Sequence, residues 1–292
     1  MLFRSMVFPA LLALCAHAES AQTDSPPLSR KQRDAQIVHE LRDADACRRA
    51  EHVIICVEPG QLPDASIAEF LREANAGAAA IRKHLGVDLD IPGGNHRQVE
   101  FFISRNAGIP HVTIAWEPWI FMHPETVARG MAPYLHEMVH VMAQWSWRNS
   151  EWIAEGFANY VASAVAEQGT GYHRSFVLPD GLARLPELYA SPEGREMIAL
   201  VGVPGRRHSY GPADADLMNR LQRDRRRYAP VYYAMSWSLV HSLADDFGVG
   251  VLRSMAASDD PSGILRQISG QSLEFYKAAW QKRLTKASKT SS

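Results

Sequence analysis

The chain has 292 residues, of which 46% are hydrophobic and 22% charged, and its formal net charge at pH 7 is −1. Such a balanced composition is typical of a globular protein, and it gives no reason to expect a nucleic-acid partner. The length is sufficient for one large domain or two small ones.

The first residues have the features of a secretion signal. Arg4 supplies a positive charge, residues 6–16 are apolar, and the Ala-His-Ala sequence at 16–18 fits the small-x-small cleavage rule. The apolar run is too short to span a membrane, and no later segment reaches that length. We therefore expect an exported protein, periplasmic or secreted, whose mature chain begins at Glu19 and has no integral membrane segment. A retained N-terminal anchor is the alternative.

The three cysteines suggest two separate roles. Cys15 ends a segment that resembles a lipobox, but Leu14 replaces the small residue expected before it, so lipid attachment ranks below a cleaved signal. Removal of the signal leaves Cys47 and Cys56. An even pair at short spacing in an exported chain indicates a disulfide, with free thiols or metal ligands as the alternatives.

Before residue 120 the pattern alternates between helix and strand, after a polar leader at 19–28. Ser66 and Glu69 form a capping-box sequence at the start of one helix, and Gly86 is its expected C-terminal stop. Periodicity and composition predict two helices, at 31–49 and 66–85. They also predict three short strands, at 53–57, 99–104 and 111–116.

Residues 136–140 read His-Glu-Met-Val-His, in a helix expected to begin near residue 132. Residues four apart share one face of a helix, so His136 and His140 can direct their imidazoles at one metal ion. Glu137 lies one position round the helix and can reach a water on that metal without binding it. Glu155, on a helix predicted at 150–166, would be the third ligand. Two imidazole nitrogens, one carboxylate oxygen and an open water position are typical of catalytic zinc.

Two other polar residues, on the helix predicted at 150–166, have roles that the sequence leaves open. Glu151 is a rival third ligand, but its position at the helix entrance favours compensation of the N-terminal dipole. Asn159 follows Glu155 by one turn and could hydrogen-bond a ligating histidine. It could equally be an ordinary exposed polar residue.

The rest of the chain is mainly helical. Residues 169–212 are dense in glycine and proline and are expected to form loops and short helices near a cleft. Helices are predicted at 231–247 and 272–284. Five arginines between 220 and 227 indicate a solvated helix face or a wall that favours acidic substrate groups.

This order of elements predicts an α+β N-terminal part followed by a helical part, with a cleft between them. The expected organisation is a signal peptide at 1–18 and a part that carries the two metal helices at 19–168. A loop-rich and then helical part follows at 169–284, and a disordered tail at 285–292.

The chain resembles the gluzincin peptidases, and more narrowly the peptidase MA-like group related to the M1 aminopeptidases. The resemblance is carried by the His-Glu-Met-Val-His motif and by Trp-Ile-Ala-Glu-Gly-Phe-Ala-Asn-Tyr at 152–160. A weaker third segment, Tyr-Tyr-Ala-Met-Ser-Trp at 232–237, is similar to a helix start found after the metal helices in this group. The resemblance implies a zincin-like fold with His136, His140 and Glu155 as zinc ligands.

The sequence also differs from related families. The third ligand follows the second histidine more closely than in M1 aminopeptidases, and the Gly-x-Met-Glu-Asn segment that binds a free α-amine is missing, so aminopeptidase specificity is not implied. Metzincins are excluded because Ala143 and Ser146 occupy the positions of their glycine and third histidine.

Motif and resemblance together predict an exported zinc metallopeptidase that acts on a peptide or protein substrate. Glu137 would take the proton from a zinc-activated water and pass it to the leaving amine. Tyr233 is the candidate donor to the oxyanion, with Tyr232 as the alternative. The strand at 111–116 could pair with an extended peptide. The competing hypotheses are a catalytically idle zincin-fold module of the envelope and a hydrolase of cell-wall amides.

Overall fold

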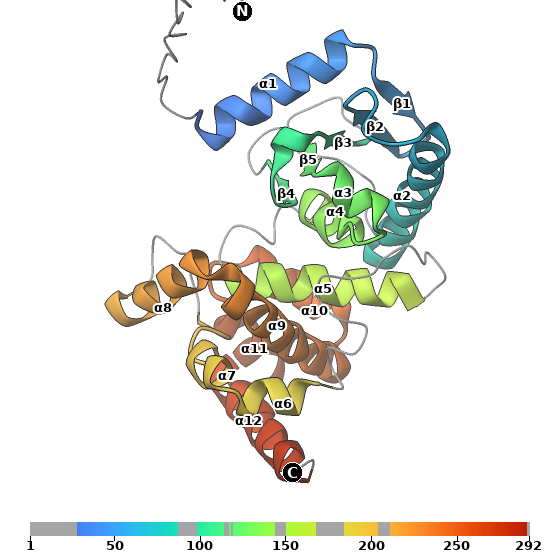
Figure 1. The fold of residues 1–292 in the computed structure, drawn as a ribbon. Helices are drawn as coiled ribbons and strands as arrows, with labels where there is room; N and C mark the ends of the chain where they lie inside the picture. Colours follow the sequence, from blue (N-terminus) through green and yellow to red (C-terminus); the bar gives the residue numbers. More distant parts are fainter. Residues whose placement is uncertain are drawn as a thin grey trace, which may run out of the picture.

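The computed structural model describes residues 28–86, 98–113, 117, 119–143, 150–167, 184–203 and 211–290. The predicted signal peptide, its cleavage site and Cys15 lie outside the described residues. Within them the fold is α+β, as predicted, with a small mixed sheet and a larger helical part. Figure 1 shows the sheet with α1 to α4 on one side of α5 (Glu151–Glu167) and the remaining helices on the other.

The sheet has five described strands, in the order β1-β2-β3-β5-β4. The three central strands run parallel, and the short edge strands pair antiparallel to their neighbours. Every residue of β2 and β3 is buried, which requires cover on both faces of the sheet. The strands are β1 (Cys47–Arg49), β2 (Val53–Val57), β3 (Val99–Ile103), β4 (His111–Val112) and β5 (Trp119–Met122).

Helices of different length cover the two faces. The long helix α2 (Asp64–Leu85) ends at Gly86, which adopts the left-handed conformation expected of a C-cap, and it contributes to the main hydrophobic core. The opposite face carries α1 (Arg30–Asp43), which begins with a capping box at Ser29. Its apolar side adds Ile37, Val38 and Leu41 to a smaller core cluster. The helix that carries His136 and His140, α4 (Tyr134–Met142), packs on the α2 side, so α1 lies on the far side of the sheet from it.

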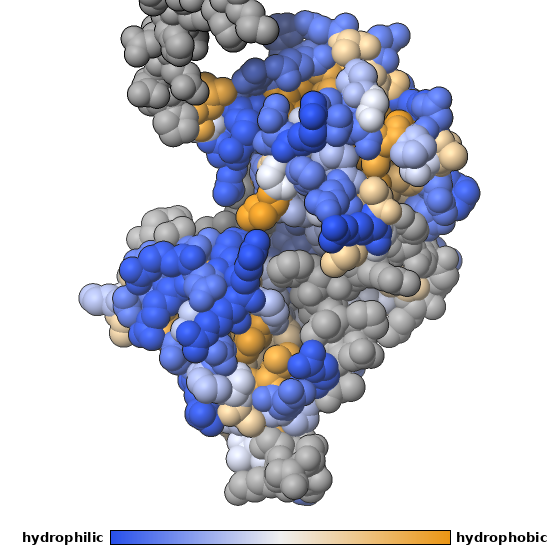
Figure 2. All heavy atoms as spheres, viewed as in Figure 1, coloured by the Kyte–Doolittle hydropathy of each residue, from blue (hydrophilic) through white to orange (hydrophobic). Residues whose placement is uncertain are grey.

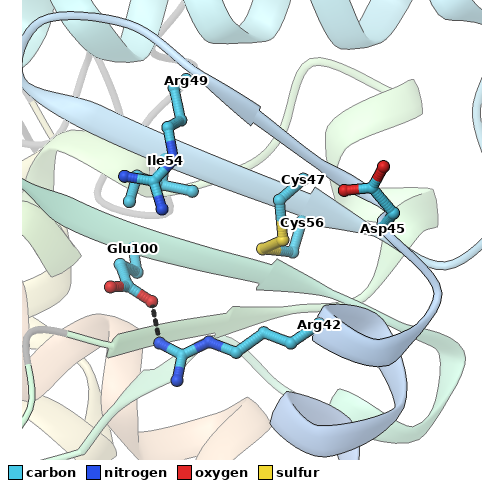
Figure 3. A pocket seen from close by; sticks show the side chains of 7 residues that line it. All are labelled: Arg42, Asp45, Cys47, Arg49, Ile54, Cys56 and Glu100. Carbon is cyan, nitrogen blue, oxygen red and sulfur yellow. Dashed lines mark hydrogen bonds and ion pairs between the residues drawn. A yellow bond between two sulfur atoms is a disulfide. The ribbon is translucent and has the colours of Figure 1, made fainter.

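A disulfide joins Cys47 to Cys56, as predicted. The two residues lie opposite each other in the β1–β2 ladder. Figure 3 shows the disulfide beside a small cavity of about 280 Å³, where Arg42 of α1 forms an ion pair with the buried Glu100 of β3. The disulfide fastens an edge strand to the sheet, and the ion pair fastens α1 to it.

The helices around the metal residues approach one another closely because two glycines lie at their contacts. A Cβ on Gly77 of α2 would lie 2.6 Å from the side chain of Leu135 in α4 (Tyr134–Met142). A Cβ on Gly156 of α5 would lie 2.5 Å from the carbonyl oxygen of Ser236 in α9 (Arg225–Phe247). Larger side chains at these two positions would separate α4 and α9 from their neighbours.

The remaining helices complete the C-terminal part. None of the helices in the described ranges is long and apolar enough to cross a membrane. The C-terminal helices are α6 (Leu185–Ala190), α7 (Pro192–Met197), α8 (Pro212–Arg223), α10 (Val249–Ala257), α11 (Pro261–Ser269) and α12 (Leu273–Thr290). The short helix α3 (Pro124–Ala128) and a 3-10 turn at Arg105–Ala107 belong to the N-terminal part.

Several boundaries differ from the predictions. The first helix stops at Asp43 and residues 47–49 form a strand, because pairing with β2 overrides their local preference. The helix α2 begins at Asp64, so the predicted capping box at Ser66 is wrong. The helix α9 begins at Arg225, six residues before the predicted start, and contains Pro230. The helix α12 continues to Thr290, into the expected tail.

Candidate metal centre

The helix α4 directs both histidines to the same point. All nine of its residues are buried, so it has no solvated face, and its side chains are fixed on every side. His136 and His140 lie one turn apart with their ring planes at 89°. Their Nε2 atoms are 2.9 Å from each other. The i, i+4 spacing therefore brings two ring nitrogens together, as the motif predicts.

Glu155 comes to this point from α5. Its Oε2 lies 3.2 Å from His136 Nε2 and 3.5 Å from His140 Nε2. The side chain is almost fully buried, like those of the two histidines. These three residues form a group whose ligand atoms all lie within 4.8 Å of one another.

The spacing of the three atoms fits a metal ion. A tetrahedral zinc with ligand bonds of about 2.0–2.1 Å holds neighbouring ligand atoms about 3.3–3.4 Å apart. The observed separations of 2.9, 3.2 and 3.5 Å fall on both sides of that value. Three lone-pair donors that converge in a buried space need a shared cation or protons between them. The donor set therefore fits a divalent metal.

Asn159 orients one of the histidines. Its Oδ1 lies 2.9 Å from Nδ1 of His136, and because an amide oxygen only accepts, Nδ1–H is the donor. In a neutral His136 this bond assigns the single ring proton to Nδ1, and the lone pair of Nε2 is then available to a metal ion. Asn159 is 2% exposed, so its alternative role as an exposed polar residue is wrong.

The charges of the site are strongly coupled. Burial alone would raise the pKa of Glu155, but the positive charge of His140 and hydrogen bonds from both histidines hold this pKa well below its usual range. Burial lowers the pKa of His136, and the Glu155 and Glu137 carboxylates more than offset that effect and raise it. The pocket thus favours an anionic Glu155 beside positive charge, which a metal cation would provide.

Glu137 is buried beside the ligands. Burial raises its pKa to about 7, and the charge of Glu155 adds to this increase, while His136 and Arg225 oppose it. A carboxyl group with a pKa near neutrality can both accept and release a proton at physiological pH. Glu137 therefore has the properties required of a general base.

Tyr233 lies next to the centre. Its ring centroid is 6.3 Å from that of His136, and its hydroxyl accepts a hydrogen bond of 3.0 Å from Arg225 Nη2. Burial and the charge of Glu155 raise the pKa of Tyr233 well above its usual value. The hydroxyl therefore keeps its proton and can donate a hydrogen bond. Tyr232 is fully buried, with its ring 5.9 Å from that of Tyr233.

Glu151 and Arg225 are two further charged residues near the candidate metal centre. Glu151 opens α5 and is not part of the group of described ligand atoms, although its charge contributes to the raised pKa of Tyr233. Arg225 was not predicted as a site residue. The only sequence signal for it was the arginine run, and the predicted start of α9 at 231 left it outside that helix.

The cavity beside the disulfide is separate from this centre. It shares no residue with the metal group and opens next to β1 and α1. Its charged lining residues include the paired Arg42 and Glu100, together with one further residue of each sign, Arg49 and Asp45.

Comparison with protein-family models and with curated protein sequences found no match to this chain.

Proposed function

We propose that this protein is an exported zinc-dependent metallopeptidase of the gluzincin type, which hydrolyses peptide bonds with Glu137 as the general base. The observation that carries the proposal is the convergence of His136, His140 and Glu155 on one point, with the buried carboxyl of Glu137 next to His136 on the same helix. A site that only binds metal has no need of a buried, unligated carboxyl at this position.

Two histidines and one carboxylate suit zinc better than harder cations, which prefer oxygen ligands. When bound, zinc would act as a Lewis acid and lower the pKa of a coordinated water. Glu137 accepts the proton from the attacking water and delivers it to the departing amine. Tyr233 donates a hydrogen bond from its hydroxyl to the oxygen that becomes negative in the transition state. Asn159 holds His136 in the tautomer that binds metal.

The edge of the sheet supports a peptide as substrate. Among the described strands, β4 (His111–Val112) is at the edge of the sheet, and it lies against the helix α4. Unpaired backbone groups at such an edge can bind an extended peptide by strand addition. A peptide added there would run beside the helix that carries His136 and Glu137. The Cys47–Cys56 disulfide is consistent with export, because such bonds persist in oxidising compartments.

The test is metal analysis combined with cleavage of a peptide library. We expect about one zinc per chain in the purified protein, loss or strong weakening of binding in His140→Ala and Glu155→Ala, and normal binding without hydrolysis in Glu137→Gln. A folded protein that binds no metal when zinc is supplied would disprove the site. Hydrolysis retained by Glu137→Gln would disprove the role of this residue.

A further inference from the structure

The arginines around the α8–α9 junction are not equivalent. Arg220 forms ion pairs with Asp216 and Glu196, and Arg227 forms one with Glu193. Arg225, the first residue of α9, is partly buried instead. Figure 2 shows a mainly hydrophilic surface over this region, where α8 adjoins α9.

One of the two hydrogen bonds of Arg225 leads to the candidate metal centre. Its Nη1 donates to Gln222 Oε1 at 3.2 Å and its Nη2 to the Tyr233 hydroxyl at 3.0 Å. Because Tyr233 lies beside His136, the guanidinium is one side chain away from the ligands.

The guanidinium is incompletely used by these contacts. It carries five N–H donors in a planar fork that matches a carboxylate, and its two acceptors, Gln222 Oε1 and the Tyr233 hydroxyl, are neutral oxygens. Within the described part of the chain, no carboxylate lies within ion-pair distance of Arg225. The N-terminus of α9 and the exposed Arg223 and Arg226 add positive character, which the exposed Asp224 only partly offsets.

We propose that Arg225 recognises a carboxylate of the peptide substrate and holds it beside the bond that is cut. The inference rests on the proposed peptidase function and names its substrate class. The carboxylate comes either from an acidic side chain or from the free C-terminus of the peptide. In both cases the group binds the partly exposed fork of Arg225 while Nη2 remains next to Tyr233.

A purely positioning role for Arg225 leads to a different expectation. If Arg225 only held the Tyr233 hydroxyl, its removal would slow the cleavage of charged and neutral peptides by the same factor. If it binds a carboxylate, its removal would abolish the preference for charged peptides. The ratio of kcat/KM for matched peptides therefore separates the two roles, whatever the loss of absolute activity.

The experiment uses three hexapeptide libraries, all N-acetylated. The first contains one Glu in each C-amidated member, the second contains Gln at the same position, and the third has no acidic side chain but a free C-terminal carboxylate. We expect at least about a tenfold preference for the first or the third library over the second, because bidentate charge-assisted hydrogen bonds are specific and strong. The preferred library identifies the source of the carboxylate.

The variants are Arg225→Gln and the matched control Arg226→Gln, which removes the same charge from the exposed neighbour. Arg225→Gln should reduce the preference to about one, and Arg226→Gln should retain it. An unchanged preference in Arg225→Gln, or no preference in the unmodified protein, overturns the inference.

A binding measurement separates this inference from the proposed function. Equilibrium dialysis of the same libraries against Glu137→Gln should show the same preference for the carboxylate without turnover. A binding preference that depends on Arg225, in a protein that cleaves no peptide, would support carboxylate recognition and refute the peptidase. Cleavage of all three libraries at equal rates would support the peptidase and refute the role of Arg225.

Discussion

Replacing Asn159 with alanine should weaken zinc binding without unfolding the protein. The substitution removes the 2.9 Å hydrogen bond that Nδ1 of His136 donates to the buried Asn159 amide oxygen. The N–H group would then lack its acceptor in a buried space, at a cost of about 1–3 kcal/mol, unless the imidazole changes tautomer. The other tautomer protonates Nε2 and removes the lone pair that faces the metal.

Both outcomes reduce zinc affinity. Loss of a hydrogen-bond partner of a ligating histidine typically weakens metal binding about 10- to 100-fold, which corresponds to about 1.4–2.8 kcal/mol. The assay is competition for zinc against a chromophoric chelator of known affinity, with circular dichroism as a check of folding. Asn159→Asp is the matched control, because its carboxylate also accepts from Nδ1–H and should retain tight binding. Unaltered zinc affinity in a folded Asn159→Ala protein would refute the assigned tautomer.

Three further predictions concern stability. In urea unfolding, Gly156→Ala should destabilise the protein by about 1–3 kcal/mol or more, because the added Cβ would lie 2.5 Å from the carbonyl oxygen of Ser236. The control Gly250→Ala should be neutral or slightly stabilising, because its added Cβ would meet no neighbouring atom within 4 Å. Reduction of the Cys47–Cys56 disulfide should lower the free energy of unfolding by about 2–3 kcal/mol in the chain-entropy model. Zinc affinity should not change, because the disulfide lies in the β1–β2 ladder whereas α4 contacts β4 and β5; altered affinity would contradict this expectation. Chelation should lower the melting temperature, because free zinc at about 100 times its Kd stabilises the native state by about 2.7 kcal/mol; a melting temperature independent of zinc would argue against a specific site.

The local part of the metal centre could be predicted from the sequence. The relation of His136 to His140 depends only on the pitch of a helix, and the structure confirms that their ring nitrogens converge. The strands at 53–57 and 99–103 and the Cys47–Cys56 disulfide were also predictable from composition and spacing. The start of α9 was not, because Pro230 and the arginine run conceal a helix that begins at Arg225 and that tertiary packing stabilises.

The sequence by itself determined the fold class and the two histidines with Glu137 between them, since helical periodicity fixes neighbours only a few residues apart. The prediction of Glu155 as a ligand needed, in addition, the resemblance of residues 152–160 to a gluzincin motif. Only the tertiary structure decided that Asn159 bonds His136 and that Tyr233 and Arg225 lie beside the centre. Their positions depend on how closely α9 packs on α5, and this distance is set by the absence of a side chain at Gly156, which no periodicity within either helix encodes.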